Sequence, residues 1–172
     1  KTIRLSKTEF TYNGKAQKPS VTVTDSAGKT IAASNYTVSY ASGSKNAGTY
    51  TATVAFKGNY SGTVKKTYTI QPKGTSLSSV KAKKKGFTAK WKKQTAQTDG
   101  YEIQYSTDSK FKKGTKIKEV NKNKTTSQSI SKLKAKKKYY VRIRTYKKVK
   151  VNGKSTKICS GWSKVKTVKT KK

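Results

Sequence analysis

Apolar and polar residues alternate with a period of two along most of the chain, as in strands that bury one face. The clearest run covers residues 139–144, where Tyr139, Val141 and Ile143 share one side and the intervening residues share the other. Leu133 lies six residues before this run, across a lysine-rich turn. β-Sandwiches tie such a corner to its own backbone through a tyrosine hydroxyl, so we predict a structural corner at Leu133 and Tyr139. The alternative is a solvated amphipathic strand with no corner.

The first half of the chain contains further short alternating runs. They cover residues 9–12, 21–23, 36–40, 50–56 and 64–70. Turn-forming pairs such as Asn13-Gly14 and Gly58-Asn59 separate them. Short strands with turns at regular spacing are typical of a β-sandwich.

The second half follows the same pattern and adds larger aromatic side chains. Its expected strands are 77–83, 87–91, 101–105, 117–120, 127–130, 139–143 and 162–168. We expect Val165 of the last strand to face inward, with Val168 as a second candidate. The residues predicted for the core are Trp91, Tyr101, Ile103, Val141 and Ile143. The whole pattern predicts an all-β protein made of two tandem β-sandwiches.

A change in composition separates the two halves. Residues 71–75 read Gln-Pro-Lys-Gly-Thr, and a proline cannot continue a central strand. We therefore predict domains at 1–72 and 73–172. The first has ten basic and two acidic residues (10 − 2 = +8), and the second has thirty-two and four (32 − 4 = +28). Most of the charge belongs to the second domain.

The first domain carries a recurring set of turn and strand motifs. They are Phe10-Thr11-Tyr12-Asn13-Gly14, Pro19, Asp25, Gly28, Tyr36 to Tyr40, Asn46 to Tyr50, and Gly58 to Gly62. As a group, over roughly residues 3–71, they resemble a bacterial immunoglobulin-like repeat of secreted Gram-positive surface proteins. The resemblance implies an extracellular spacer or adhesive module without catalytic residues.

The second domain carries a different set of motifs over residues 75–170. They are Trp91, Gly100 to Tyr105, the Leu133–Tyr139 spacing with Val141 and Ile143, and Gly161-Trp162-Ser163. This set is similar to a fibronectin type III domain, which implies a second immunoglobulin-like β-sandwich. Residues 134–138 are lysines and one alanine where the family usually has proline and glycine, so we expect a looser corner. The chain has no Arg-Gly-Asp triplet, so nothing supports integrin binding.

Few residues are available for catalysis or metal binding. With no histidine and one cysteine, the chain cannot build a His-dependent triad, a Cys/His zinc site or an intrachain disulfide. Its six carboxylates are scattered, unlike the facing pair of a glycosidase. We predict no enzyme activity, no cofactor, and a buried structural role for Cys159. Glu9 and Glu102 either assist a Lys–Asn isopeptide bond or pair with lysines across a sheet.

Lysine is the strongest chemical signal. Forty-two basic residues against six acidic ones give a net charge of +36, and only three of the forty-two are arginine. Base-reading proteins depend on arginine, so the composition favours a diffuse polyanion partner over specific nucleic-acid recognition. The candidate polyanion-binding residues are Lys83, Lys84, Lys85, Lys92, Lys93, Lys136, Lys137, Lys138, Lys147 and Lys148.

We place these lysines in turns and at strand ends, with residues 147–148 capping the long strand, so that they form positive rims at both ends of the sandwich. The alternative is a solvated surface that only keeps the protein soluble and its sheet edges unpaired. Exposed aromatic rings are the other candidate site, because sugars stack on flat rings. The alternative is that these rings pack into the core or its rim and bind no sugar. The rings concerned are Tyr60, Tyr140, Tyr146 and Trp162.

These observations predict a non-catalytic extracellular spacer and attachment module, on the wall or surface of a Gram-positive bacterium. Its second domain would contact an anionic cell-wall polymer, such as teichoic acid, or a glycan. The alternative is a carbohydrate-binding or adhesive accessory module of an extracellular enzyme. We expect monomeric modules in a longer chain, since the sequence starts without methionine, and no membrane insertion, since no apolar run is long enough.

Overall fold

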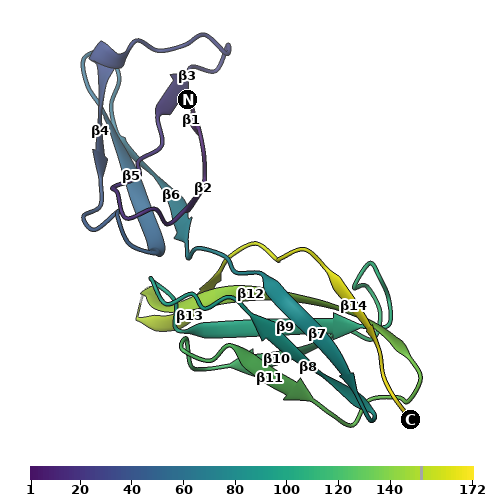
Figure 1. Ribbon diagram of the computed structural model, residues 1–172. Coiled ribbons are helices and arrows are strands. Elements are labelled where there is room, and N and C mark those ends of the chain that lie inside the picture. The colour runs from purple at the N-terminus through teal and green to yellow at the C-terminus, as the bar shows by residue number, and fades with distance from the viewer. Residues whose placement is uncertain (152) are drawn as a thin grey trace. The chain divides into compact units, whose positions relative to one another are not determined.

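The computed structural model describes residues 1–151 and 153–172. The chain divides into two compact units, Lys1–Gln71 and Pro72–Lys172 (Figure 1). This division lies one residue before the boundary expected from composition. The described residues form fourteen strands, one short 3-10 turn η1 (Ala33–Asn35) and no α-helix. Each unit has its own buried core, so we describe each by itself.

Unit 1 builds two sheets. The smaller sheet pairs β1 (Thr2–Leu5) with β3 (Val21–Thr24). The larger has the order β2-β6-β5-β4, formed by β2 (Glu9–Thr11), β6 (Thr63–Gln71), β5 (Gly48–Phe56) and β4 (Tyr36–Tyr40). β2 joins β6 in parallel, whereas the other pairs are antiparallel. The alternating runs predicted for this half all contribute to these sheets.

Alternate residues of these strands form the core of unit 1. Ile3, Val23 and Val54 belong to one buried cluster. Tyr68 and Ile70 belong to a second, in which the Tyr68 ring packs edge-on against neighbouring aromatic rings. Aromatic side chains supply much of the bulk here, because a domain this small has few residues with which to fill its interior.

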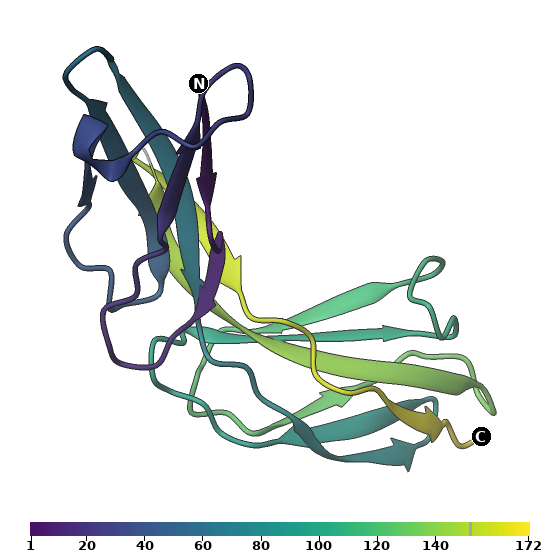
Figure 2. The same cartoon turned by 90° about the horizontal axis from the view of Figure 1, so that it is seen from above.

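Unit 2 is a sandwich of a three-stranded and a five-stranded sheet. The first has the order β11-β8-β7, formed by β11 (Ser127–Ile130), β8 (Gly86–Trp91) and β7 (Leu77–Lys83). The second has the order β10-β9-β12-β13, with β14 also paired to β12. Its strands are β10 (Lys116–Val120), β9 (Gly100–Ser106), β12 (Lys138–Val151), β13 (Lys154–Cys159) and β14 (Lys166–Lys169). The long strand β12, light green in Figure 2, pairs with β14 in its first part and with β13 in its last.

The two sheets of unit 2 enclose one apolar core. Tyr101, Ile103, Val141 and Ile143 are fully buried, and Trp91 is 3% exposed. Ile103 and Ile143 lie opposite each other on β9 and β12. The Trp91 and Tyr101 rings pack with their centroids 5.3 Å apart. A fully buried aromatic or branched side chain stabilises by about 1.5–3 kcal/mol relative to exposure, so this cluster accounts for much of the unit's stability.

The loop between β11 and β12 forms the corner at Leu133 and Tyr139. The Tyr139 hydroxyl accepts a hydrogen bond from the Lys134 N–H at 3.3 Å. The Leu133 N–H donates to the Lys85 carbonyl at 2.8 Å, and the Lys136 N–H donates to the Thr170 carbonyl at 3.1 Å. Although it lacks proline and glycine, the corner is thus bound to the chain segments on both of its sides.

The C-terminal part of unit 2 differs from the sequence-based expectation. β13 was not predicted, and β12 continues to Val151, so Lys147 and Lys148 lie inside the strand and do not cap it. β14 begins at Lys166, and Val165 before it is 43% exposed. The inward placement of Val165 was therefore wrong. Residues 160–165 connect β13 to β14 outside any strand, where the alternation of a pleated sheet does not apply.

Candidate polyanion-binding surface

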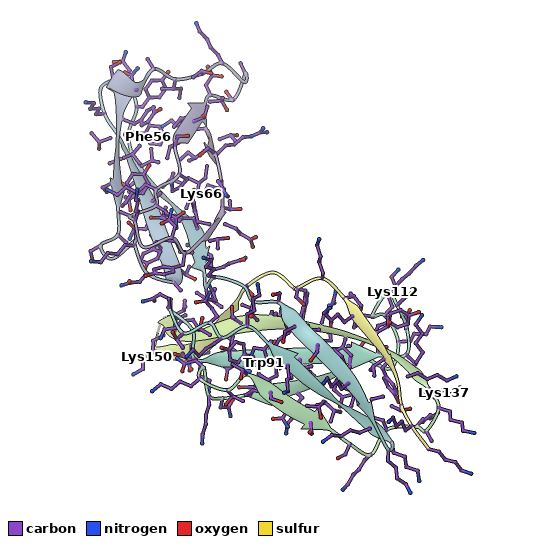
Figure 3. The ribbon with its side chains drawn as sticks, in the orientation of Figure 1. Phe56, Lys66, Trp91, Lys112, Lys137 and Lys150 are labelled. Carbon is purple, nitrogen blue, oxygen red and sulfur yellow. The ribbon has the colours of Figure 1, made fainter. Side chains whose placement is uncertain are left out.

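Several lysine-rich segments of unit 2 meet at the end of the sandwich that carries the C-terminus. The β7–β8 turn, the corner and the segment after β14 are joined directly by backbone hydrogen bonds, including Lys85 N–H to the Lys171 carbonyl at 3.0 Å. Figures 1 and 2 both place the C-terminus beside these segments. Figure 3 shows Lys112 of the β9–β10 loop and Lys137 of the corner at this end, with Lys150 at the opposite end of the unit.

We call this surface the lysine end and define it by fifteen lysines, all exposed. They are Lys83, Lys84, Lys85, Lys110, Lys112, Lys113, Lys116, Lys132, Lys134, Lys136, Lys137, Lys138, Lys169, Lys171 and Lys172. They come from four separate stretches of the sequence. Six of the ten candidate polyanion-binding residues belong to this set.

One acidic side chain, Asp108, lies among these segments, and it forms no ion pair with any residue that the structure describes. Its carboxylate accepts backbone N–H bonds from Lys110, Lys112 and Lys113, at 3.0, 2.8 and 3.1 Å. These bonds hold the pKa of Asp108 below its ordinary value. Four ion pairs form among residues 1–151 and 153–172, and none of them includes a lysine of the lysine end.

The other end of unit 2 is electrostatically different. Lys147 pairs with Asp99 at 2.9 Å, and the Lys148 N–H donates to the same carboxylate at 2.8 Å. Burial acts to raise the pKa of Asp99, but these lysine contacts outweigh it and the pKa is lowered. Lys92 and Lys93 directly follow β8 at this end. Both ends carry lysines, but ion pairing with a carboxylate occurs at this end and involves no lysine of the lysine end.

Two of the three arginines lie in an ordered array on the outer face of β9 and β12, which the sequence-based reasoning missed. The Arg142 and Arg144 guanidinium groups lie 4.7 and 4.2 Å from the Trp162 ring centroid. Arg144 also binds Glu102 with Nη2–Oε2 at 2.7 Å. Only their i,i+2 spacing on a predicted strand pointed to a shared face. Arg142 and Arg144 thus have partners inside the unit.

The aromatic rings considered for sugar stacking are partly or fully covered. Tyr146 is fully buried. Tyr60 packs near Phe56, with ring centroids 6.4 Å apart. The Tyr140 and Trp162 rings lie beneath the cationic groups of neighbouring side chains. None of the four is a freely exposed flat platform.

Of the two carboxylates considered for covalent chemistry, Glu102 forms ion pairs and Glu9 forms none with a described residue. Lys157 lies 3.2 Å from Glu102 and also pairs with Glu119. Burial acts to lower the pKa of Lys157, but the hydrogen bonds to Glu119 and Glu102 outweigh it and the pKa is raised. The amine therefore stays protonated, whereas amide formation needs it neutral. Glu9 is exposed on β2, and it makes no ion pair with any residue that the structure describes.

Other reactive groups are sparse. Cys159 ends β13 and is partly exposed, so the prediction that it is buried was wrong; partial burial still raises the pKa of its thiol. Across residues 1–151 and 153–172 there is no group of three metal-ligating side chains. No helix in the same part of the chain is long and apolar enough to cross a membrane.

Comparison with known proteins identifies both units. Residues 15–72 match the bacterial Ig-like domain (group 3) family, and residues 71–159 match the fibronectin type III domain family. No curated protein matches the chain. Similar solved structures include chicken CNTN1 FN1–FN3 domains (16% identity, TM-score 0.47, 74% of this chain) and a beta-1,2-glucanase from Parabacteroides distasonis (14%, 0.44, 72%).

The chain spans 44% and 18% of the length of those two structures. Domains of the two matched families are generally non-catalytic and typical of the extracellular parts of multidomain proteins. The fibronectin match covers more than half of the chain, and the Ig-like match adjoins it. The predicted pair of resemblances is confirmed: the chain belongs to the fibronectin type III family and carries a bacterial Ig-like domain in tandem before it.

Proposed function

We propose that this chain is a non-catalytic spacer and attachment module of an extracellular protein of a Gram-positive bacterium. Its lysine end would contact an anionic polymer of the cell wall, with teichoic acid as the leading candidate. The observation that supports this most directly is the set of fifteen exposed lysines of the lysine end, none of which forms an ion pair with a residue that the structure describes.

The proposed mechanism is multivalent Coulomb attraction. A net charge of magnitude about 2–8 is enough to keep a small domain soluble. The charge of residues 73–172 (32 − 4 = +28) is several times larger, and like charges gathered at one end oppose folding. A polyanion would relieve this repulsion and release its own counterions, so binding should weaken as salt rises.

The test is sedimentation of the full chain with purified Gram-positive cell walls, with and without teichoic acids, over a salt series. The first variant replaces six lysines of the lysine end by glutamine: Lys83, Lys84, Lys85, Lys136, Lys137 and Lys138. The control makes the same change in net charge in unit 1: Lys7, Lys15, Lys18, Lys29, Lys65 and Lys66.

We expect the wild-type chain and the unit 1 control to bind teichoic-acid-bearing walls at low salt, and the lysine-end variant to lose most of this binding. Equal losses in the two variants would contradict a role for the lysine end. Wall binding that does not change with salt concentration and does not require teichoic acid would favour the carbohydrate-binding alternative.

A further inference from the structure

A cavity of about 410 Å³ opens within the lysine end, between the corner and the β9–β10 loop. Its size is within the range of about 300–1,000 Å³ typical of small-molecule sites. Four of its lining residues are lysines: Lys116 from the start of β10, and Lys132, Lys134 and Lys137 from the corner. Cationic side chains thus come from two different chain segments.

Two tyrosines, Tyr105 and Tyr139, add aromatic surface to the cavity. Their ring centroids lie 6.4 Å apart in an edge-to-face arrangement. The Tyr139 hydroxyl already accepts the Lys134 N–H. The Tyr105 hydroxyl makes no hydrogen bond to any residue that the structure describes, and burial raises the pKa of Tyr105. Tyr105 therefore offers a neutral hydrogen-bond donor that the fold itself does not use.

The backbone of the corner is in an unfavourable conformation for lysine. Lys132 and Lys136 have φ of 60° and 52°, and Lys85 beside them has φ of 42°. The backbone of a non-glycine residue is strained in this left-handed region, and glycine would remove that strain. Both the strain and the charge repulsion at this loop reduce stability, a combination expected where side chains serve binding.

We propose that this cavity is a binding site for a phosphate group of an anionic polymer, which deepens the function proposed above and rests on it. Lys116, Lys132, Lys134 and Lys137 supply the positive charge, and the Tyr105 hydroxyl donates one hydrogen bond. The aromatic and aliphatic lining accommodates the polyol carbon atoms next to the phosphate.

Phosphate is favoured over a carboxylate by the chemistry of the lining. The lining contains no arginine, whose planar fork recognises carboxylate and phosphate alike, so lysine alone supplies its positive charge. Lysine binds phosphate as a compact point charge. Ammonium groups from two chain segments suit a tetrahedral anion, whose oxygens point in several directions, better than a planar one.

The experiment is an NMR titration of the full chain with sn-glycerol 3-phosphate, in 0.15 M salt, followed on backbone amides near Gly114, Lys134 and Lys137. Acetate and chloride at matched ionic strength serve as competing anions. Three variants are compared with the wild type: Tyr105→Phe, the pair Lys134→Gln with Lys137→Gln, and the pair Lys122→Gln with Lys124→Gln. The last pair, the outer pair, removes the same charge from exposed positions that belong neither to the lysine end nor to the cavity lining.

We expect saturable shifts with glycerol phosphate that acetate does not reproduce. Tyr105→Phe should weaken binding by about 3- to 10-fold, the range expected for one lost hydrogen bond. The cavity pair should weaken it by at least about tenfold, because hydrogen bonds to charged groups are stronger. The outer pair should change it by less than about twofold, because exposed charges are screened over about 8 Å at this salt concentration.

Equal losses for the two lysine pairs, or full affinity in Tyr105→Phe, would overturn this inference. If wall binding nevertheless persists, the proposed function stands without a shaped site. If glycerol phosphate binds as expected while the walls do not, the proposed function fails and the cavity remains a phosphate site. The two failures are thus distinguishable.

Discussion

At the scale of single residues, close backbone contacts decide which side chains unit 2 tolerates. Gly100 begins β9, and a Cβ atom there would lie 2.2 Å from the Val120 carbonyl oxygen and 2.6 Å from the Tyr146 hydroxyl oxygen. The first of these neighbours is backbone and cannot rotate away. Any larger residue must therefore displace β10 from β9, which explains a glycine inside a strand.

We expect Gly100→Ala to lower the free energy of unfolding of unit 2 by about 1–3 kcal/mol, the usual effect of overpacking. Gly161→Ala is the matched control: an added Cβ there meets nothing within 4 Å, so its effect should stay below about 0.5 kcal/mol. Urea denaturation followed by tryptophan fluorescence measures this, because both tryptophans belong to unit 2. Similar midpoints for the two variants would contradict the close approach.

At the scale of elements, β12 organises unit 2. It pairs with β9, β13 and β14, so its inward residues build the core while its outward residues carry the arginine array. Arg144 lies opposite Glu102 in the β9–β12 register and donates to it from Nε at 2.8 Å. Because Glu102 is 6% exposed, this ion pair is shielded from water more than a surface pair is.

We expect Arg144→Lys to destabilise the protein by about 1–2 kcal/mol, because lysine lacks the planar group that stacks on Trp162 while it binds Glu102. Arg4→Lys is the control, since Arg4 is exposed on β1, and its effect should stay within about 0.5 kcal/mol. Scanning calorimetry of the full chain measures both. An Arg144→Lys variant as stable as the control would show that the array contributes nothing beyond its charge.

The element scale also shows where sequence patterns succeed and fail. The expected strands 77–83 and 127–130 have the same bounds as β7 and β11. The expected strand 162–168 was right only in its last part: β14 begins at Lys166 and buries Val168, whereas Val165 lies in the connecting segment before it and is exposed. Ile117, which helped to locate β10, is 50% exposed because β10 is an edge strand. The alternation of apolar and polar residues thus predicts where strands form better than it predicts which of their residues are buried.

At the scale of the whole molecule, the main electrostatic effect on folding stability is repulsion among the basic side chains. The chain carries +36, and charges of one sign repel one another more strongly in the compact state than in the unfolded chain. The four ion pairs among the described residues belong to unit 2 and involve only Arg144, Lys147 and Lys157 as cations. For most of the basic side chains, solvent and counterions therefore provide the screening that ion pairs do not.

Sodium chloride should raise the melting temperature, because the screening length falls from about 30 Å at 0.01 M to about 3 Å at 1 M. The six-lysine variant of the lysine end should show a higher melting temperature than the wild type at 0.01 M, and the difference should shrink at 1 M. The unit 1 control variant should gain less, since its lysines are more dispersed. Melting temperatures independent of salt in all three proteins would contradict this account of charge repulsion.

The sequence by itself determined the all-β class, the two families in tandem, the alternation of most strands and the excess of lysine over arginine. These properties are local or compositional, so no long-range contact is needed to read them. The tertiary structure alone decided which lysines gather. Residues 83–85, 110–116, 132–138 and 169–172 are far apart in sequence and meet only through strand pairing and the corner's backbone hydrogen bonds.

The same long-range pairing decided which charges are neutralised. Asp99, Glu102 and Glu119 face basic residues 38 to 55 positions away, whereas Asp108 binds its own loop. A linear pattern of lysines therefore could not distinguish the compensated end from the lysine end. The register of β9, β10 and β12, together with the path of the corner, places four lysines and an unpaired tyrosine hydroxyl around one cavity.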